Sequence, residues 1–442
     1  MDKMTTALVM DQMPRTFTDA IVICRKLEIP FLWIDALCIV QNDAADWQRE
    51  SAMMDKIYSN AYITLAASEA IDSNGGLLGS FVPAAQGIDP DWKCIAVRIA
   101  CRHSRSGESP LAKRGWTLQE ASLSRRILYF TGRQLRWQCL ATRQYEDELL
   151  NKAEDSESDF PLLLRSLELP EQAPLSRWYD EWQTISEAYS KRDYTRFSDR
   201  FPALAGITSY FQNILQDQPF AGLWRNALVS GLLWQPHDRT STLQVDGVPS
   251  WSWLAVMGEI EYNKLWTTFR ENSETTIPQL SLITASVVWA GVPLTSDLTS
   301  ASLTVRGRLL KVQVIENDMT GNLITIKPDG GAAPTKIAPD TVTYSTPHEL
   351  FCLQIAIVQV KYDEDFDVKL RAGVEYNEDF PNGEGYRIVL LLARTGAGVD
   401  EYRRLGIRAL RNRAEEQVIC DRLYASPERT VTLVLLLDDS VC

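Results

Sequence analysis

The sequence predicts an α+β protein with an α/β N-terminal domain, a helical segment and a mostly β C-terminal region. Three observations support this fold class. The first 70 residues alternate between helical and strand patterns, and residues 176–233 carry apolar side chains at helical spacing. After Pro249, short β-branched runs alternate with turn residues up to the C-terminus. The chain of 442 residues is long enough for about two to three domains.

Four elements are expected near the N-terminus. Residues 16–28 have apolar side chains at helical spacing and are expected to form a helix. Residues 46–60 are expected to form a second helix, with Asp46 available as its N-cap. The short apolar runs at residues 31–35 (FLWID) and 62–66 (YITLA) are typical of buried strands. Strand, helix and strand in this order predict a parallel sheet.

The next segments contain a loop, a hairpin and a helical stripe. Residues 73–90 are rich in Gly, Pro, Ser and Ala and are expected to form a long loop. RILYF and QLRWQC flank residues 131–133 (TGR), which predicts a β-hairpin. Further on, four apolar side chains at helical spacing predict a helix face packed in the core: Trp178, Trp182, Ile185 and Tyr189.

Changes in composition along the chain predict its domain organisation. The acidic stretch after Tyr145 has few apolar residues, which is typical of a solvated linker. We therefore expect an α/β domain at residues 1–145, an acidic linker at 146–175, a helical segment at 176–248 and a mostly β region at 249–442.

Charge and composition exclude several functions. Asp and Glu total 58 against 45 Lys and Arg, so the net charge of −13 argues against a nucleic-acid partner. The eight Cys form no CxxC pair and there are only three His, so no metal site is expected. No apolar stretch approaches the ~18 residues of a membrane span. Without a clear signal peptide, we expect a cytoplasmic protein.

Familiar catalytic motifs are also missing from the sequence. It contains no P-loop, no GxGxxG after a strand, no HExxH and no GxSxG. Any chemistry is therefore expected to depend on carboxylates, arginines and aromatic side chains.

Glu50 is the first candidate site residue. In the expected helix at residues 46–60 it lies beside the apolar face that includes Trp47 and Met54. A carboxylate at such a border is either paired or functional. The alternative role is a salt bridge to Arg114 or Arg25.

Asp35 is the second candidate, because it is the one charged residue within the apolar run FLWIDALCIV. It falls where a parallel strand is expected to end, and ligands of α/β sheets bind at such ends. Its alternative role is to cap the following turn.

The third group of candidates lies in KRGWTLQEASLSRRILYF and comprises Arg114, Trp116 and Glu120. Arginine suits bidentate contacts with phosphate or carboxylate groups. The alternative role of Arg114 is to neutralise Asp35 or Glu50. A pocket that combines these groups would suit a ligand with ribose hydroxyls, a phosphate and a flat ring.

The motifs that carry these candidates resemble the fungal heterokaryon incompatibility (HET) domain family. The matching stretches are FLWIDALCIVQND, DWQRESAMMDKIYSNAYITLAAS and RGWTLQEASLSRRILYF. Four downstream stretches resemble segments that follow the domain in many such chains: WQTISEAYSKRDYTRFSDRFPALAGI, AGLWRNALVSGLLW, PSWSWLAVMGEI and EYRRLGI. The family usually begins with a strand carrying a Leu-Ser-Tyr-x-Trp-Gly type motif, which is absent here. The resemblance thus implies a member shortened at its N-terminus.

The resemblance implies a fungal protein of nonself recognition or programmed cell death. The family is distantly similar to the Toll/interleukin-1 receptor (TIR) fold, a parallel α/β sheet. Some TIR-like domains cleave NAD at the nicotinamide–ribose bond with a Glu that follows a Trp by three or four residues. In DWQRE this implies Glu50 as the catalytic residue, with Asp35 beside it. Trp33 or Trp47 would then stack on a base, with NAD as substrate and no cofactor or metal.

Three functions remain open at this point. The first is an NAD glycohydrolase acting as a cell-death effector. The second is a non-enzymatic HET module that signals through self-association. The third is a small-molecule enzyme of fungal secondary metabolism on the same scaffold. The expected partners are accordingly a small-molecule or nucleotide ligand and a second copy of the chain.

Overall fold

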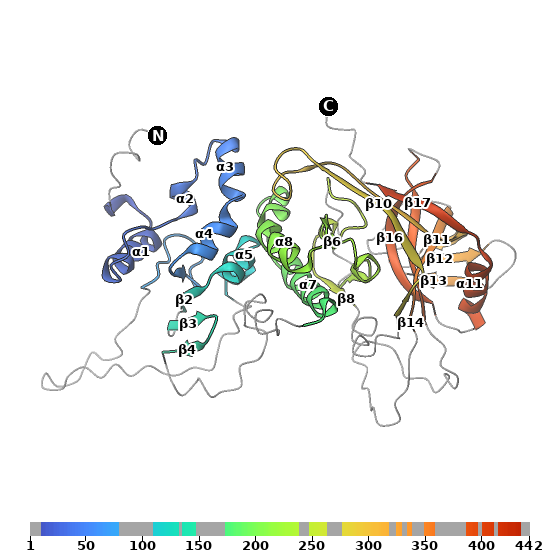
Figure 1. Ribbon diagram of the computed structural model, residues 1–442, viewed down its shortest axis with the longest axis horizontal. Helices are drawn as coiled ribbons and strands as arrows, with labels where there is room; N and C mark the ends of the chain where they lie inside the picture. Colours follow the sequence, from blue (N-terminus) through green and yellow to red (C-terminus); the bar gives the residue numbers. More distant parts are fainter. Residues whose placement is uncertain are drawn as a thin grey trace, which may run out of the picture. The chain divides into compact units, whose positions relative to one another are not determined.

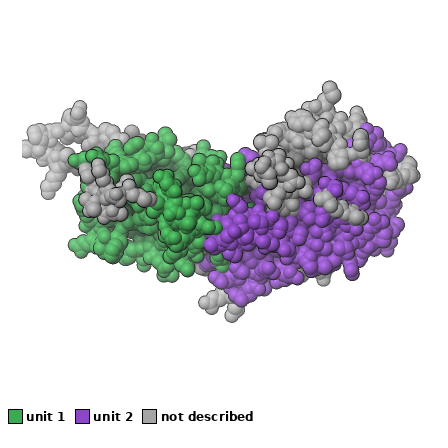
Figure 2. Space-filling model, turned by 90° about the horizontal axis from the view of Figure 1, so that it is seen from above, with its two compact units in different colours: residues 1–173, 192–209 green, residues 174–191, 210–442 purple. Residues whose placement is uncertain are grey.

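The computed structural model describes the chain in two compact units, each with its own sheet (Figures 1 and 2). Unit 1 comprises residues 1–173 and 192–209, and unit 2 comprises residues 174–191 and 210–442. The described residues are 10–78, 109–131, 135–146, 173–237, 247–262, 276–317, 324–328, 334–337, 349–358, 386–396, 400–410 and 414–434. These contain both helices and strands, which confirms the α+β class.

Unit 1 begins with a series of short helices. They are η1 (Met10–Gln12), α1 (Arg15–Lys26), α2 (Asp35–Cys38), α3 (Ala44–Ser51) and α4 (Met54–Asn60). After residues that lie outside the described ranges come η3 (Leu111–Lys113) and α5 (Trp116–Leu123), and the later segment of this unit holds η6 (Phe197–Arg200). Helix α8 (Pro202–Leu215) is divided between the two units after Ser209.

The predicted strand at residues 31–35 is wrong. These residues have no strand, and Asp35 begins helix α2 instead. A short apolar run gives no period that separates a strand from other buried segments. Here the run is not buried, because Phe31 is 87% exposed. Residues 31–34 therefore connect α1 to α2 without joining the sheet.

The predicted helix at residues 46–60 is two helices, α3 and α4. Asp43 rather than Asp46 caps α3, since its Oδ1 accepts hydrogen bonds from the backbone N–H groups of Ala45 (2.9 Å) and Asp46 (3.1 Å). The carboxylate of Asp46 accepts instead from the N–H of Val40 at 2.8 Å. Two acidic residues three apart both suit a helix start, and the fold of the preceding loop selects the first.

The sheet of unit 1 has four strands in the order β1-β2-β3-β4, which are Thr64–Ala66, Arg126–Phe130, Leu135–Cys139 and Arg143–Tyr145. The β1–β2 pair is parallel, with Thr64 opposite Ile127, whereas β2–β3 and β3–β4 are antiparallel. The expected hairpin of β2 and β3 is thus confirmed, although its turn lies outside the described residues. In the described part of this sheet β1–β2 is the only parallel pair, so the expected TIR-like parallel sheet is not confirmed.

Helix α1 covers one face of this sheet. Its buried side chains Ala20 and Ile23 form an apolar cluster with Leu77 and Phe130, against which Leu65 also packs. Ala20 and Ile23 are three residues apart and therefore lie on one face of α1, and successive side chains of a strand point to opposite faces of the sheet. The acidic linker expected at 146–175 falls almost wholly outside the described residues.

Unit 2 begins with helices and short strands rich in tryptophan. Its elements here are α7 (Leu175–Ser190), β5 (Pro219–Phe220), β6 (Leu223–Trp224), α9 (Leu228–Gly231), β7 (Trp234–Pro236), η7 (Trp253–Ala255) and β8 (Ile260–Tyr262). The predicted stripe on α7 is confirmed at Trp182, Ile185 and Tyr189, which are almost completely buried, whereas Trp178 is only partly buried.

A large sheet forms the rest of unit 2. Its strands are β9 (Thr276–Pro278), β10 (Leu280–Trp289), β11 (Leu298–Asn317), β12 (Ile324–Pro328), β13 (Thr335–Ile337), β14 (Glu349–Val358), β15 (Tyr386–Arg394), β16 (Glu401–Leu410) and β17 (Glu428–Val434). Strand β11 pairs with both β17 and β14, which closes β11, β17, β16, β15 and β14 into a ring. Helix α11 (Ala414–Ala425) packs on these strands through Ile419 and Leu423 (Figure 1). This confirms the mostly β region.

Candidate functional site

Glu120 on α5 is the carboxyl group of unit 1 with the most unusual environment. Burial raises its pKa from 4.5 to about 7, because an ionised carboxylate loses its hydration there. The positive charges of Arg114 and Arg192 oppose this rise, and the negative charge of Asp35 adds to it. The phenol of Tyr58 also donates a hydrogen bond to the Glu120 carboxylate. The group can therefore gain or lose a proton near neutral pH.

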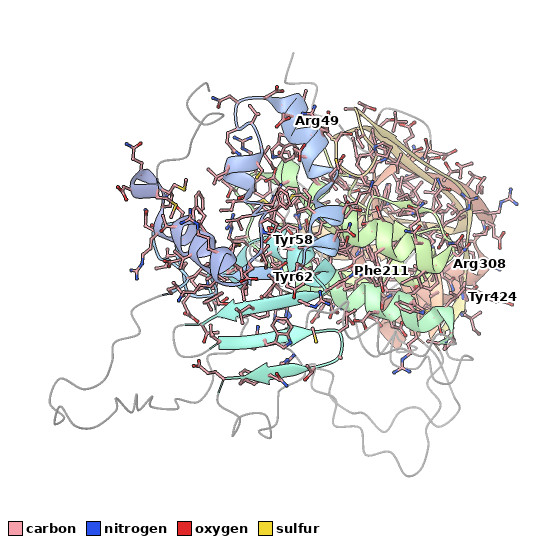
Figure 3. All side chains as sticks on the ribbon, turned by 60° about the vertical axis from the view of Figure 1, so that its left-hand side comes forward. Arg49, Tyr58, Tyr62, Phe211, Arg308 and Tyr424 are labelled. Carbon is pink, nitrogen blue, oxygen red and sulfur yellow. The ribbon has the colours of Figure 1, made fainter. Side chains whose placement is uncertain are left out.

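Tyr58 lies on α4 (Figure 3), and its phenol is hydrogen bonded to this carboxyl group. Burial raises its pKa well above the ordinary value of 10, and the charges of Glu120 and Asp35 raise it further. The ring of Trp33 meets the Tyr58 ring edge-on, with centroids 5.8 Å apart. Tyr58 is therefore a neutral hydrogen-bond donor held in a fixed orientation.

Asp35 lies at the first turn of α2, in an exposed position. Its Oδ1 accepts a hydrogen bond from the N–H of Ala36 at 2.7 Å. Its charge raises the pKa of both Glu120 and Tyr58. The N-cap of α2 is Ile34, with no side-chain capping hydrogen bond, so the bond from Asp35 to Ala36 is not a helix cap.

Arg114 lies just before α5 and completes the group. Its side chain is exposed, and its charge lowers the pKa of both Glu120 and Tyr58. Three sequence-predicted residues, Asp35, Arg114 and Glu120, thus act on one another electrostatically. Trp33 joins them through Tyr58.

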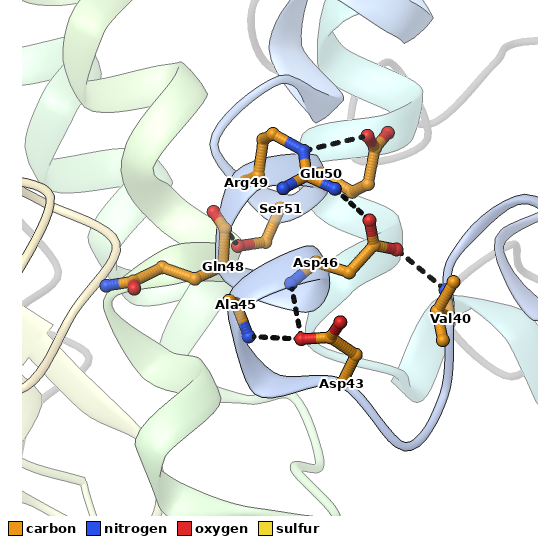
Figure 4. A network of polar contacts seen from close by, with 8 residues as sticks. All are labelled: Val40, Asp43, Ala45, Asp46, Gln48, Arg49, Glu50 and Ser51. Carbon is orange, nitrogen blue, oxygen red and sulfur yellow. Dashed lines mark hydrogen bonds and ion pairs between the residues drawn. The ribbon is translucent and has the colours of Figure 1, made fainter.

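Glu50 has a different environment on α3 (Figure 4). Its Oε1 lies 3.9 Å from Nε of Arg49, while another guanidinium nitrogen of Arg49 binds Asp46. The Glu50 side chain is 26% exposed and that of Arg49 is 61% exposed. Among the described interactions, those of Glu50 stay within α3 and do not include Glu120.

Two tryptophans join α3 to α5. The ring of Trp47 meets that of Trp116 edge-on, with centroids 6.2 Å apart. The indole N–H of Trp116 donates to Oδ2 of Asp199 at 3.2 Å. Trp47 is three residues before Glu50, and Trp116 is four residues before Glu120, so each pair lies along one helix face. The two aromatic rings therefore lie between the helices that carry the two glutamates.

Sequence reasoning did not select Tyr58 and Arg192 as site residues. In the sequence, the spacing of Tyr58 from Trp47 puts both residues on one apolar helix face. This pattern predicts burial of Tyr58 and not a role in the site. Arg192 follows the acidic stretch and lies 72 positions after Glu120, so no local pattern connects the two. Its place beside Thr117, whose Oγ1 it approaches at 2.8 Å, comes from the tertiary structure.

The arrangement combines the exposed carboxyl group of Asp35, the Glu120 carboxyl group with a pKa of about 7, the phenol of Tyr58 and the guanidinium of Arg114. Groups of these kinds serve as acids, bases and binding groups for polar small molecules. The described residues include no cluster of three or more His, Cys, Asp or Glu that could hold a metal ion. Nor does any helix in the described ranges have the length and apolarity to cross a membrane.

Comparison with known proteins identifies the N-terminal part of the chain. Residues 1–120 match the family model "Heterokaryon incompatibility protein (HET)". No curated protein and no solved structure matches the chain. The matched residues include Asp35, Tyr58, Arg114 and Glu120.

Proposed function

Because residues 1–120 form a heterokaryon incompatibility (HET) domain, we propose that this chain is a fungal cell-death effector that hydrolyses NAD. The HET domain itself indicates a function of the heterokaryon incompatibility and cell-death type. The NAD step is the finer proposal, in which the bond cleaved is the one between nicotinamide and ribose.

The observation that carries the proposal is the Glu120 carboxyl group, whose pKa is about 7. A general base works best when its pKa lies near the working pH. The phenol of Tyr58 donates a hydrogen bond to this carboxyl group, and the charge of Asp35 raises the pKa of both groups. Two carboxyl groups with different environments are the usual equipment for cleaving a bond to a sugar.

In the proposed reaction the two carboxyl groups have separate roles. The C–N bond breaks with its electron pair moving to the pyridine nitrogen, so nicotinamide leaves as a neutral molecule. Asp35, as a carboxylate, stabilises the positive charge that develops on the ribose. Glu120 accepts a proton from the water that attacks the anomeric carbon. The products are nicotinamide, ADP-ribose and one proton.

The other predicted residues serve binding in this proposal. Arg114 is the cation for a substrate phosphate. The rings of Trp33, Trp47 and Trp116 are the candidates for stacking on a base. Glu50 remains the alternative catalytic carboxylate, as the DWQRE motif implies.

The experiment is to incubate the purified full-length chain with NAD and to measure nicotinamide release. We expect Glu120→Gln to lower the rate by about 100-fold or more, because the base is lost. The wild-type rate should rise with pH with a midpoint near 7, as Glu120 ionises. Asp35→Asn should also lower the rate, whereas Glu69→Gln changes an exposed glutamate of the same unit and should not.

Two outcomes would contradict this assignment. If Glu50→Gln abolishes release and Glu120→Gln does not, the catalytic carboxylate is on α3. If the wild-type chain releases no nicotinamide, NAD is not its substrate. In that case, binding of another small molecule at this site would support the metabolic-enzyme alternative.

A second candidate function is a non-enzymatic module that self-associates. The connection between α1 and α2 supports it, since Leu27, Phe31 and Leu32 are 49%, 87% and 36% exposed. Adjacent exposed apolar side chains are typical of interaction surfaces. This function predicts no NAD turnover and an oligomer whose size increases with protein concentration. Substituting Phe31→Ser should then reduce the oligomer.

A further inference from the structure

Residues 192–206 attach to the start of α5, although they lie beyond the part of the chain that matches the HET family. Asp193 forms a parallel bridge with Arg114, in which Gly115 N–H donates to the Asp193 carbonyl at 2.9 Å. The N–H of Asp193 donates to the Lys113 carbonyl at 2.6 Å. Because Asp193 is adjacent to Arg192, this backbone pairing also positions the backbone of Arg192.

Two further contacts continue along α5 towards Glu120. Asp199 accepts the hydrogen bond from the indole of Trp116. The backbone N–H of Gly206 donates to Oε1 of the buried Gln119 at 2.6 Å. The segment is therefore bound to α5 up to the residue that precedes Glu120.

The Arg192 side chain is the part of this segment that acts on the site. Its Nη1 donates to the carbonyl of Arg114 at 3.1 Å and to Oγ1 of Thr117 at 2.8 Å. The Thr117 hydroxyl in turn lies 2.7 Å from the Arg114 carbonyl. The guanidinium therefore connects the residue before α5 to the first turn of the helix, and its charge also reaches Glu120.

We propose that Arg192 is a positioning residue for the Glu120 site, supplied by a segment beyond the HET match. It holds the first turn of α5 in place through Arg114 and Thr117, and it favours the ionised form of Glu120. Its catalytic consequence rests on the proposed function, whereas its effect on the Glu120 carboxyl group does not.

The charged and titratable groups around Glu120 come from four parts of the chain. Arg114 precedes α5, Asp35 begins α2, Tyr58 lies on α4 and Arg192 follows α7. Arg114 and Arg192 lower the pKa of the Glu120 carboxyl group, and Asp35 raises it. Removal of the Arg192 charge alone should therefore shift the titration of Glu120 to higher pH.

The test titrates Glu120 in the full-length chain by NMR of ¹³C-labelled glutamate carboxyl groups. Glu120→Gln identifies the signal. We expect Arg192→Gln to move the midpoint to higher pH. Arg192→Lys keeps the charge, so it should keep the midpoint, but it lacks the Nη1 atom that donates to both acceptors. Arg196→Met is the matched control, since it removes a cation of the same segment whose charge acts on Asp199.

A second readout is NAD hydrolysis at pH 7. Arg192→Lys should lower kcat by about three- to tenfold through the lost hydrogen bond, with an unchanged pH midpoint. Arg192→Gln should lower kcat and also shift the midpoint upward. If the wild-type chain has no activity, the proposed function fails, but the NMR titration still tests Arg192.

The proposal is overturned if Arg192→Gln leaves the Glu120 midpoint at its wild-type value. It is also overturned if Arg196→Met shifts the midpoint as far as Arg192→Gln does. If Arg192→Gln does not fold, the Arg192→Lys variant provides the test of the positioning role. A lysine variant with wild-type kcat and wild-type Tm contradicts the positioning role.

Discussion

At the scale of single residues, Glu120 shows how burial raises the pKa of a carboxyl group at a cost in stability. The carboxyl group titrates near 4.5 when exposed and at about 7 in the folded chain. Between these values the folded protein holds a proton that the unfolded chain releases. The free energy of unfolding therefore falls as the pH rises from about 4.5 to 7, and it stays lower above this range.

Glu120→Gln should remove this dependence. A neutral amide of similar shape keeps the contact with Tyr58 but never ionises, so the variant should be more stable than wild type at pH 8 by about 2 kcal/mol. The difference should be smaller at pH 5, where the wild-type group is protonated. Urea unfolding at both pH values measures this.

Glu69→Gln is the control for this comparison, because it removes an exposed carboxylate of the same unit. Its stability should follow that of the wild type at both pH values. A wild-type chain that gains stability relative to Glu120→Gln between pH 5 and pH 8 would contradict the raised pKa of Glu120.

At the scale of elements, the attachment of residues 192–206 to α5 depends on a glycine. Gly115 has helical backbone angles, so an alanine there would meet no conformational cost. A Cβ atom at Gly115 would, however, lie 2.1 Å from Cε1 of Tyr194. The aromatic ring can lie on the start of α5 only because this position has no side chain.

Gly115→Ala should therefore lower the free energy of unfolding by about 1–3 kcal/mol through overpacking. It should also lower NAD turnover, because the segment that carries Arg192 would be displaced. Gly231→Ala is the control in another helix, since its Cβ would lie 3.3 Å from the side chain of Leu223. Equal losses of stability in the two variants would show that the contact with Tyr194 is not the cause of the loss in Gly115→Ala.

At the scale of the whole molecule, long-range contacts within unit 2 join its tryptophan-rich part to its large sheet. Arg404 on β16 is 3% exposed, and its guanidinium lies 3.5 Å from the centre of the Trp234 ring. It donates to the carbonyls of Leu232 and Trp234 at 2.9 and 2.6 Å. A buried cation with such partners is costly to disturb, because the carbonyls it leaves would be unpaired.

Arg404→Met should lower the free energy of unfolding by about 2–4 kcal/mol, since charged hydrogen bonds and a cation–π contact are lost together. Arg403→Met removes a partly buried arginine from the opposite face of the same strand and should cost less. Thermal or urea unfolding, followed by tryptophan fluorescence, measures both. If the Arg403 variant lost as much stability as the Arg404 variant, the Trp234 contact would not be the cause.

The sequence by itself determined which segments are helical or β where the period was long and regular. It predicted a buried stripe on α7, the β2–β3 hairpin and the β-rich C-terminal region, and its motifs resemble the HET family, whose model matches residues 1–120. It also named Asp35, Arg114 and Glu120 among its candidate site residues, although with Glu50 and Asp35 as the catalytic pair. These features depend on local spacing and local motifs, and not on contacts with distant parts of the chain.

The tertiary structure decided the rest. Residues 31–34 lie outside the sheet, and the strands β2, β3 and β4 are antiparallel. The tertiary structure brought Tyr58 and Arg192 to Glu120 from segments far apart in sequence, and it left Glu50 paired with Arg49. Burial and charge at one carboxyl group are sums over neighbours in space. No spacing along the chain encodes such a sum, so the sequence could name Glu120 as a candidate but could not give the raised pKa of its carboxyl group.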